Sequence, residues 1–132
     1  MKPATLAPAY CSLYPALCEV ARENGYALCI HGTLGCDMDL LAVAWTDEAK
    51  SANELVRAIV EKLDGQMHPG GRPNGDGTFT EVDPWEPTKK PHGRLAWSIC
   101  LRDFAWNGTN PFIDLSVIPP NRLDESPATT TA

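Results

Sequence analysis

The sequence predicts an α+β fold with a mixed, mostly antiparallel sheet and with helices packed on one face of that sheet. Two segments repeat apolar residues at helical spacing, and several apolar runs have the composition of strands. Their order is helix, strand, strand, helix and then three strands, unlike the regular alternation of a parallel doubly wound sheet. A chain of 132 residues can build one hydrophobic core, so we expect one domain over residues 1–120 and a polar, disordered tail over residues 121–132.

The first part of the chain predicts a helix followed by two strands. Residues up to about Tyr10 are rich in proline and alanine and should form an arm. Ser12 is the expected N-cap of a helix that ends at Gly25. The apolar runs "YALCIHG" at 26–32 and "DMDLLAVAW" at 37–45 predict two strands joined by a short turn.

The segment "SANELVRAIVEKLDG" at 51–65 is the clearest helix signal in the chain. Ser51 and Glu54 match the capping-box pattern S-x-x-E, in which each side chain accepts a hydrogen bond from a backbone N–H of the other residue. Gly65 is expected to supply the left-handed residue that ends this helix. Residues 66–77 are rich in glycine and proline and predict a loop without a regular element.

The second half of the chain predicts three strands. They are expected in "TFTEV" at 78–82, "RLAWSICLRDF" at 94–104 and "PFIDLSVIP" at 111–119. A loop should cover residues 85–93, and the segment "NGTN" at 107–110, which begins with an Asn-Gly pair, predicts a hairpin turn between the last two strands.

Composition excludes some classes of function. A net charge of −6 argues against general nucleic-acid binding, which requires a basic surface for phosphates. No apolar run approaches the roughly 18–20 residues that span a bilayer, and the N-terminus has no secretory signal, so we expect a cytoplasmic protein without a membrane partner. The five cysteines have no C-x-x-C spacing, which favours reduced cysteines acting as small hydrophobic residues over a zinc site.

Acidic residues interrupt two of the predicted strands. Asp37 and Asp39 share one face of a strand, whereas Met38 and Leu40 share the face that should pack on the helices. Asp114 lies inside the last apolar run, so three carboxylates converge if the two strands are neighbours. Like charges at short range repel one another, and a divalent cation such as Mg²⁺ or Mn²⁺ would hold all three ionised. The alternative is a set of surface acids on a solvated sheet face.

Residues that can hold phosphate accompany these acids. In "HGT", Gly32 allows the backbone to approach a phosphate closely, and the hydroxyl of Thr33 can donate to phosphate oxygens. Lys89, Lys90 and Arg94 form the one basic cluster of the sequence. Arg94 is the candidate cation for a phosphate ligand, and a solvated basic loop is the alternative.

Taken together, "HGTLGCDMDLLAV" and "PFIDLSV" resemble the polymerase-β-like nucleotidyltransferase superfamily. The resemblance implies the minimal nucleotidyltransferase fold, with Gly32 and Thr33 holding phosphate, Asp37 and Asp39 as metal ligands and Asp114 as the third carboxylate. More closely, "HGTLGCDMDLLAVAWTDEA" and "KPHGRLAWSI" are similar to small single-domain proteins of phages and prophages that carry a nucleotidyltransferase label. This likeness covers most of residues 10–120.

Two features depart from the family pattern. Only Leu34, Gly35 and Cys36 separate the Gly-Thr pair from the paired acids, which is shorter than the family's usual spacer. A shorter loop encloses less of a triphosphate. No helical domain follows the predicted sheet, whereas in larger members such a domain contacts the base and the acceptor.

These observations predict a magnesium-dependent nucleotidyltransferase that moves a nucleoside monophosphate from a nucleoside triphosphate to an unidentified acceptor. The three acids would be its catalytic residues and metal ligands. The residues expected to bind the nucleotide are Gly32, Thr33 and Arg94. One alternative is a catalytically inactive relative that binds a nucleotide or a partner protein on the same face; another is the antitoxin-like half of a two-protein system. Trp85, in a loop between prolines, is a candidate for stacking on a base.

Overall fold

The α+β class is confirmed by a computed structural model, which describes residues 6–67, 70–101 and 111–121. Within these ranges, two α-helices, one 3-10 helix and eight strands follow one another. The helices are α1 (Ala7–Glu23), α2 (Ala52–Leu63) and η1 (Pro91–Gly93). The strands are β1 (Tyr26–His31), β2 (Asp37–Ala44), β3 (Gln66–Met67), β4 (Gly70–Pro73), β5 (Phe79–Val82), β6 (Thr88–Lys89), β7 (Leu95–Cys100) and β8 (Phe112–Ile118).

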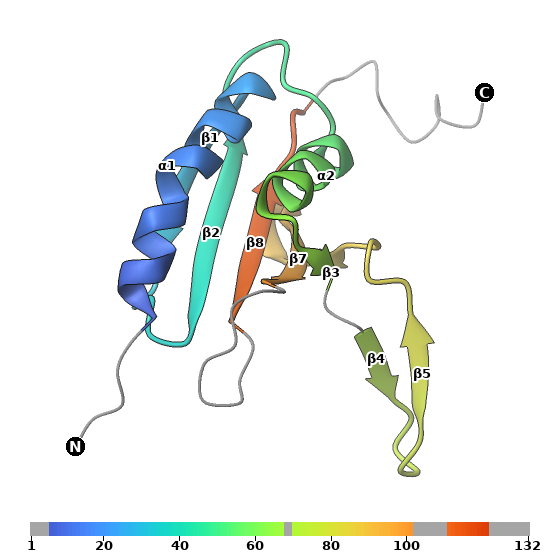
Figure 1. Cartoon of the computed structure of the whole chain (residues 1–132). Helices are drawn as coiled ribbons and strands as arrows, with labels where there is room; N and C mark the ends of the chain where they lie inside the picture. The colour runs from blue at the N-terminus through green and yellow to red at the C-terminus, as the bar shows by residue number, and fades with distance from the viewer. Residues whose placement is uncertain (1–5, 68–69, 102–110, 122–132) are drawn as a thin grey trace.

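The main sheet is mixed and mostly antiparallel, as predicted. Its strand order is β1-β2-β8-β7-β3, and β6 pairs with the other half of the same edge of β7. Only β2 and β8 pair in parallel within the described part of the chain, and every other pair is antiparallel. Both α-helices lie on one side of this sheet, while β4 and β5 form a separate hairpin that extends from it (Figure 1).

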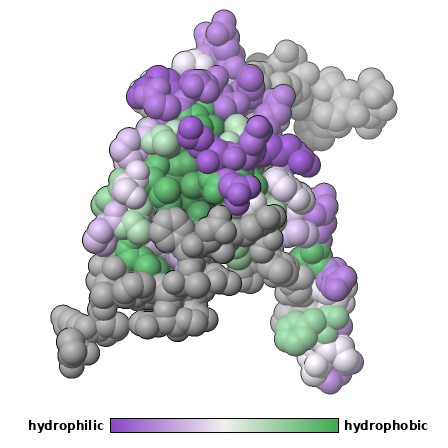
Figure 2. All heavy atoms as spheres, viewed as in Figure 1, coloured by the Kyte–Doolittle hydropathy of each residue, from purple (hydrophilic) through white to green (hydrophobic). Residues whose placement is uncertain are grey.

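The hydrophobic core lies between the helices and one face of the sheet. Met38 and Leu40 of β2 are fully buried there, which confirms the face that the sequence assigned to them. Leu115 and Ile113 of β8 alternate into the same layer, and Ile59 of α2 packs on it from above. Apolar residues are visible between the two helices, below hydrophilic residues at the upper end (Figure 2). The opposite face of the sheet is therefore the one left to carry polar side chains.

The first helix begins earlier than the sequence predicted. It starts at Ala7, so the expected arm is wrong over residues 7–10. Ser12 is not the N-cap, because it lies inside the helix and its hydroxyl donates to the carbonyl of Ala9 at 2.7 Å. Burial of Tyr10, which is 1% exposed, stabilises this added turn and outweighs the absence of a side-chain cap. Pro15 is tolerated inside the helix on an exposed position.

The second helix begins as predicted and ends differently. The reciprocal hydrogen bonds of Ser51 and Glu54 confirm the capping box. The left-handed residue at the end is Asp64, with φ of 50°, so the role predicted for Gly65 is wrong. Gly65 is required for another reason, since a Cβ there would lie 3.0 Å from the carbonyl oxygen of Cys100.

Some short strands lie where the sequence predicted loops. The prediction of a loop without regular elements over 66–77 is wrong, because β3 and β4 lie within it, and β6 lies within the predicted loop at 85–93. These segments pair through backbone groups, which any residue type supplies. The predicted strand at 78–82 is confirmed as β5. The turn expected at 107–110 and the tail from 122 onward lie outside the described residues.

The five cysteines are free thiols. Cys11, Cys29 and Cys36 are exposed, so the expectation that the cysteines serve as small hydrophobic residues is wrong for these three. Cys18 and Cys100 are half-buried, as expected for cysteines that serve as small hydrophobic residues.

Replacement of Gly25 by alanine should be far more destabilising than replacement of Gly75. Both residues have φ of 85°, so both variants carry the left-handed strain of about 1–2 kcal/mol. Only at Gly25 would the new Cβ also collide, at 2.5 Å from the Cα of Ala49, which adds about 1–3 kcal/mol. Nothing lies within 4 Å of a Cβ at Gly75. Urea unfolding of both variants measures the difference, and equal losses would contradict the role assigned to the contact with Ala49.

Candidate metal centre

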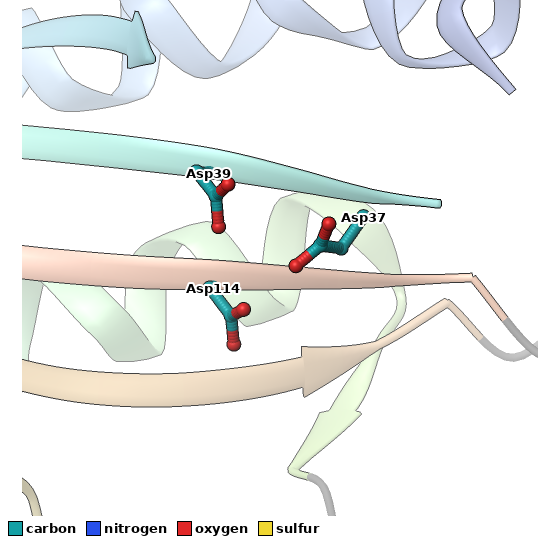
Figure 3. A group of neighbouring side chains, drawn as sticks. All are labelled: Asp37, Asp39 and Asp114. Atoms are coloured by element: carbon teal, nitrogen blue, oxygen red, sulfur yellow. The ribbon is translucent and has the colours of Figure 1, made fainter. Parts of the chain in front are cut away.

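Three carboxylates meet on the open face of the sheet. Asp39 of β2 is the direct neighbour of Asp114 in the parallel β2–β8 ladder, and Asp37 lies two residues before Asp39 on the same face. One oxygen from each of the three carboxylates lies within 4.8 Å of the others. Figure 3 shows the side chains of Asp37 and Asp39 extending from β2 toward β8, and the side chain of Asp114 extending from β8 on the side of β7. The convergence predicted from the sequence is therefore present.

The donor set fits a hard divalent cation. All three carboxylates are half-buried, and each offers oxygen atoms, which are the ligands that such cations prefer. Asp37, Asp39 and Asp114 thus lie close enough together to bind a metal ion.

The half-buried position of Asp114 beside the other two acids shifts the pKa of its carboxyl group. The pKa of Asp114 is raised to about 6 by burial first, and also by a hydrogen bond with Asp37 and by the negative charges of Asp37 and Asp39. Ser98 of β7 acts in the opposite direction, because its hydroxyl donates to Oδ1 of Asp114 at 3.0 Å. The metal-free cluster therefore retains a proton at pH values where an ordinary aspartate is ionised.

The turn before the acids supports the cluster sterically. Gly32 has φ of 83°, and a Cβ on it would lie 2.6 Å from Oδ2 of Asp39. A side chain at residue 32 would therefore have to displace the carboxylate of Asp39 from this position. The hydroxyl oxygen of Thr33 accepts a hydrogen bond from the N–H of Gly35 at 3.3 Å and shapes the turn. That Gly32 and Thr33 hold phosphate remains a prediction.

A buried tyrosine connects the starts of the two acid-bearing strands. The hydroxyl of Tyr10 donates to the carbonyl of Cys36 at 2.7 Å and lies 3.4 Å from the carbonyl oxygen of Phe112. Cys36 precedes Asp37, and Phe112 is the ladder neighbour of Asp37. Burial raises the pKa of Tyr10 to about 12, so the phenol stays protonated and keeps its donor.

An open cavity of about 420 Å³ adjoins the acids on the same face. Asp39 and Asp114 lie at one part of its lining, and Lys90 and Arg94 contribute cations to it. The guanidinium of Arg94 donates from Nε to the carbonyl of Pro91 at 3.3 Å and from Nη1 to Oγ of Ser116 at 3.4 Å. Within the described ranges, Arg94 forms no ion pair with a carboxylate. The structure therefore brings Arg94 to the cavity that the acids line.

The wall of the cavity contains the segment 82–88, which Trp85 anchors. Trp97 donates its indole N–H to the carbonyl of Trp85 at 2.8 Å, and the guanidinium carbon of Arg57 lies 4.4 Å from the centre of the Trp85 ring. Arg57 thus occupies one face of the ring that the sequence suggested for base stacking. Trp85 contacts the core and holds the wall in place.

Sequence reasoning missed Ser98, Ser116 and Tyr10. Ser116 had a usable signal, because it lies two residues after Asp114 and therefore on the same strand face. Ser98 and Tyr10 had none, since the strand pairing and the helix packing that bring them to the acids are long-range.

Comparisons of the chain with protein-family models, with curated proteins and with solved structures return no match. Among the described residues, no helix combines the length and the apolar character needed to cross a membrane.

Tyr10→Phe and Tyr14→Phe form a matched pair of variants. Each removes one hydroxyl from α1, and each leaves a strand-side carbonyl without its donor, since Tyr14 donates to Leu28 at 2.6 Å. Both variants should lose about 1 kcal/mol in the free energy of unfolding. Only Tyr10→Phe should weaken Mn²⁺ binding, because only its hydroxyl joins the strands that carry the acids. Chemical denaturation and Mn²⁺ titration by electron paramagnetic resonance give the two measurements. Equal Mn²⁺ affinities in both variants would show that Tyr10 serves stability alone.

The metal-free protein should become less stable, relative to Asp114→Asn, as the pH rises. The native pKa of Asp114 is about 6 against an ordinary value of 3.8, so the native state binds this proton more tightly than the unfolded state does. The stabilisation that the bound proton gives is complete below about pH 4 and is lost as the pH rises through 6. Urea unfolding in EDTA between pH 4 and 8 should show the advantage of Asp114→Asn growing over this range. Adding Ser98→Ala to the wild-type background should move the midpoint to higher pH, because its hydrogen bond lowers the pKa. If the difference in the free energy of unfolding between the wild type and Asp114→Asn did not depend on pH, the raised pKa of Asp114 would be contradicted.

Proposed function

We propose that this protein is a Mg²⁺-dependent nucleotidyltransferase that transfers a nucleoside monophosphate from a nucleoside triphosphate to an acceptor nucleophile. The observation that carries the proposal is the direct pairing of Asp39 with Asp114, with Asp37 beside them, at the border of a cavity lined by Arg94. Among the described residues, no carboxylate forms an ion pair with this arginine. Metal-binding acids and a cation for phosphate, on one face, are what phosphoryl transfer requires.

Asp37, Asp39 and Asp114 would hold the metal, and their all-oxygen donor set suits Mg²⁺ or Mn²⁺. When bound, such an ion neutralises negative charge on the phosphates and orients them for in-line displacement.

The chain's own residues account for the remaining requirements. The acceptor oxygen forms a bond to the α-phosphorus, the bond from that phosphorus to the bridging oxygen breaks, and pyrophosphate leaves with the electron pair. Asp114 would accept the proton of the acceptor as a general base. Arg94 would bind the phosphates through its free N–H groups.

The resemblance of the sequence to the polymerase-β-like superfamily supports the same proposal, since the paired acids and the third acid occupy the positions that its pattern requires. The short turn between Gly32 and Asp37 favours a second candidate, an inactive relative that binds a nucleotide with metal and does not transfer it. A transfer assay separates the two.

The purified chain should release pyrophosphate from at least one nucleoside triphosphate in the presence of Mg²⁺ and a cell extract as the source of acceptors. Asp39→Asn removes a charge and little volume, so metal affinity and turnover should fall together. Because the metal supplies several kcal/mol of transition-state stabilisation and each 1.36 kcal/mol is tenfold in rate, the expected loss of turnover is on the order of 100-fold or more. The melting temperature without metal should hold or rise as repulsion is relieved.

Glu61→Gln is the control, because Glu61 is an exposed acid on α2, on the helix side of the sheet. It should retain wild-type turnover. Binding of a nucleotide with metal but without transfer, for every nucleoside triphosphate tested, would reject the enzyme and leave the inactive relative.

A further inference from the structure

We propose that the polyphosphate chain of the nucleotide lies along β8 from Asp114 toward Arg94, and not over the Gly32–Thr33 turn where the sequence placed it. The inference rests on the proposed function for its metal-bound nucleotide, and it assigns the direction in which the phosphates lie. Three observations carry it.

The first observation is the state of Arg94. Its guanidinium is half-buried and is held by the carbonyl of Pro91 and the hydroxyl of Ser116, which are both uncharged. Asp83 and Glu86 line the same cavity, yet no carboxylate of the described residues pairs with Arg94. A guanidinium has five N–H donors in a fixed fork, so donors remain for a ligand. A fixed cation with free donors, facing a cavity, is suited to a phosphate.

The second observation is the spacing along β8. Ser116, which accepts from Arg94, lies two residues beyond Asp114 on the same strand face. Because each strand residue advances about 3.4 Å, the guanidinium contact lies roughly 7 Å from Asp114 along the strand. A chain of three phosphoryl groups can extend over this length. The side chain of Ser98 and the second cation, Lys90, line the same cavity.

The third observation is that the turn side offers less room. The Cα of Gly32 is approached by the carboxylate of Asp39, so the space that the glycine leaves is taken up by the protein itself. The hydroxyl oxygen of Thr33 accepts a hydrogen bond from the N–H of Gly35, which leaves this side chain a single O–H donor and no charge for a phosphate. Neither Gly32 nor Thr33 lines the cavity.

The lining of the cavity also favours phosphate over a base. Trp97 is its one tryptophan, and no phenylalanine or tyrosine is present among the described residues that line it. The Trp97 side chain is 4% exposed and is packed in the core, so it presents no face for stacking. Lys90, Arg94, Ser98 and Ser116 line the cavity together with the carboxylates of four acids from the described part of the chain.

The test measures how the cost of removing Arg94 depends on the number of phosphates. Binding of a nucleoside mono-, di- and triphosphate, and of inorganic tripolyphosphate, is titrated calorimetrically with Mn²⁺ present. Arg94→Ala should weaken the binding of the triphosphate and of tripolyphosphate by about tenfold or more, because charged hydrogen bonds to phosphate are among the strongest. The affinity for the monophosphate should change less than threefold, and the affinity for Mn²⁺ alone should stay the same. Arg94→Lys, which keeps the charge and loses the fork, should recover part of the loss.

Two further variants complete the comparison. Lys89→Ala is the matched control, because Lys89 is a neighbouring exposed cation that does not line the cavity, and it should leave all affinities unchanged. Thr33→Ala tests the other side of the acids. The inference would be overturned if the loss of affinity in Thr33→Ala grew with the number of phosphates. It would also be overturned if Arg94→Ala lost equal affinity for the mono- and the triphosphate.

The outcome is separable from that of the proposed function. If the wild-type chain binds triphosphate with the graded dependence on Arg94 but never releases pyrophosphate, the transferase is rejected and the phosphate direction stands. If pyrophosphate is released while Arg94→Ala binds tripolyphosphate as the wild type does, the transferase stands and the direction is wrong. Failure of the wild type to bind either probe with Mn²⁺ rejects both.

Discussion

The parallel pairing of β2 with β8 is the constraint on which the rest of the site depends. It places Asp39 directly opposite Asp114, at the spacing of neighbouring strands, in the middle of a sheet. The parallel pair is possible because β2 and β8 are far apart in sequence, so that a long connection can return the chain to the same end of the sheet.

Repulsion between the three neighbouring carboxylates destabilises this part of the folded protein, and several neighbouring features reduce the repulsion. Ser98 donates to Asp114, the missing side chain of Gly32 leaves room for Asp39, and the raised pKa of Asp114 allows a retained proton. Tyr10 joins the starts of both strands from the opposite layer. A structure that holds repelling groups together with this much support is consistent with a cationic ligand, which would reduce the repulsion. The same face carries the cavity and Arg94, so the acids and a cationic side chain share one surface.

Much of the fold was readable because local signals agreed with the final structure. The capping box of Ser51 and Glu54, the alternation of Met38 and Leu40, and the apolar run around Asp114 depend on neighbouring residues only. The errors arose where backbone pairing or distant packing decided the outcome. Neither β3 nor β4 has the composition of a strand, and their partners lie in other segments. The early start of α1 depends on where Tyr10 is buried.

The sequence by itself determined the fold class, the positions of the main helices and strands, and the face of each strand on which the acids lie, because side-chain periodicity is a local property of the backbone. It also identified Asp37, Asp39, Asp114 and Arg94 as candidates by residue type and pattern. Only the tertiary structure decided that β2 and β8 are neighbours, that Arg94 lines the same cavity as the acids, and that Gly32 makes room for Asp39. Those facts depend on contacts between segments far apart in the chain, which no local pattern encodes.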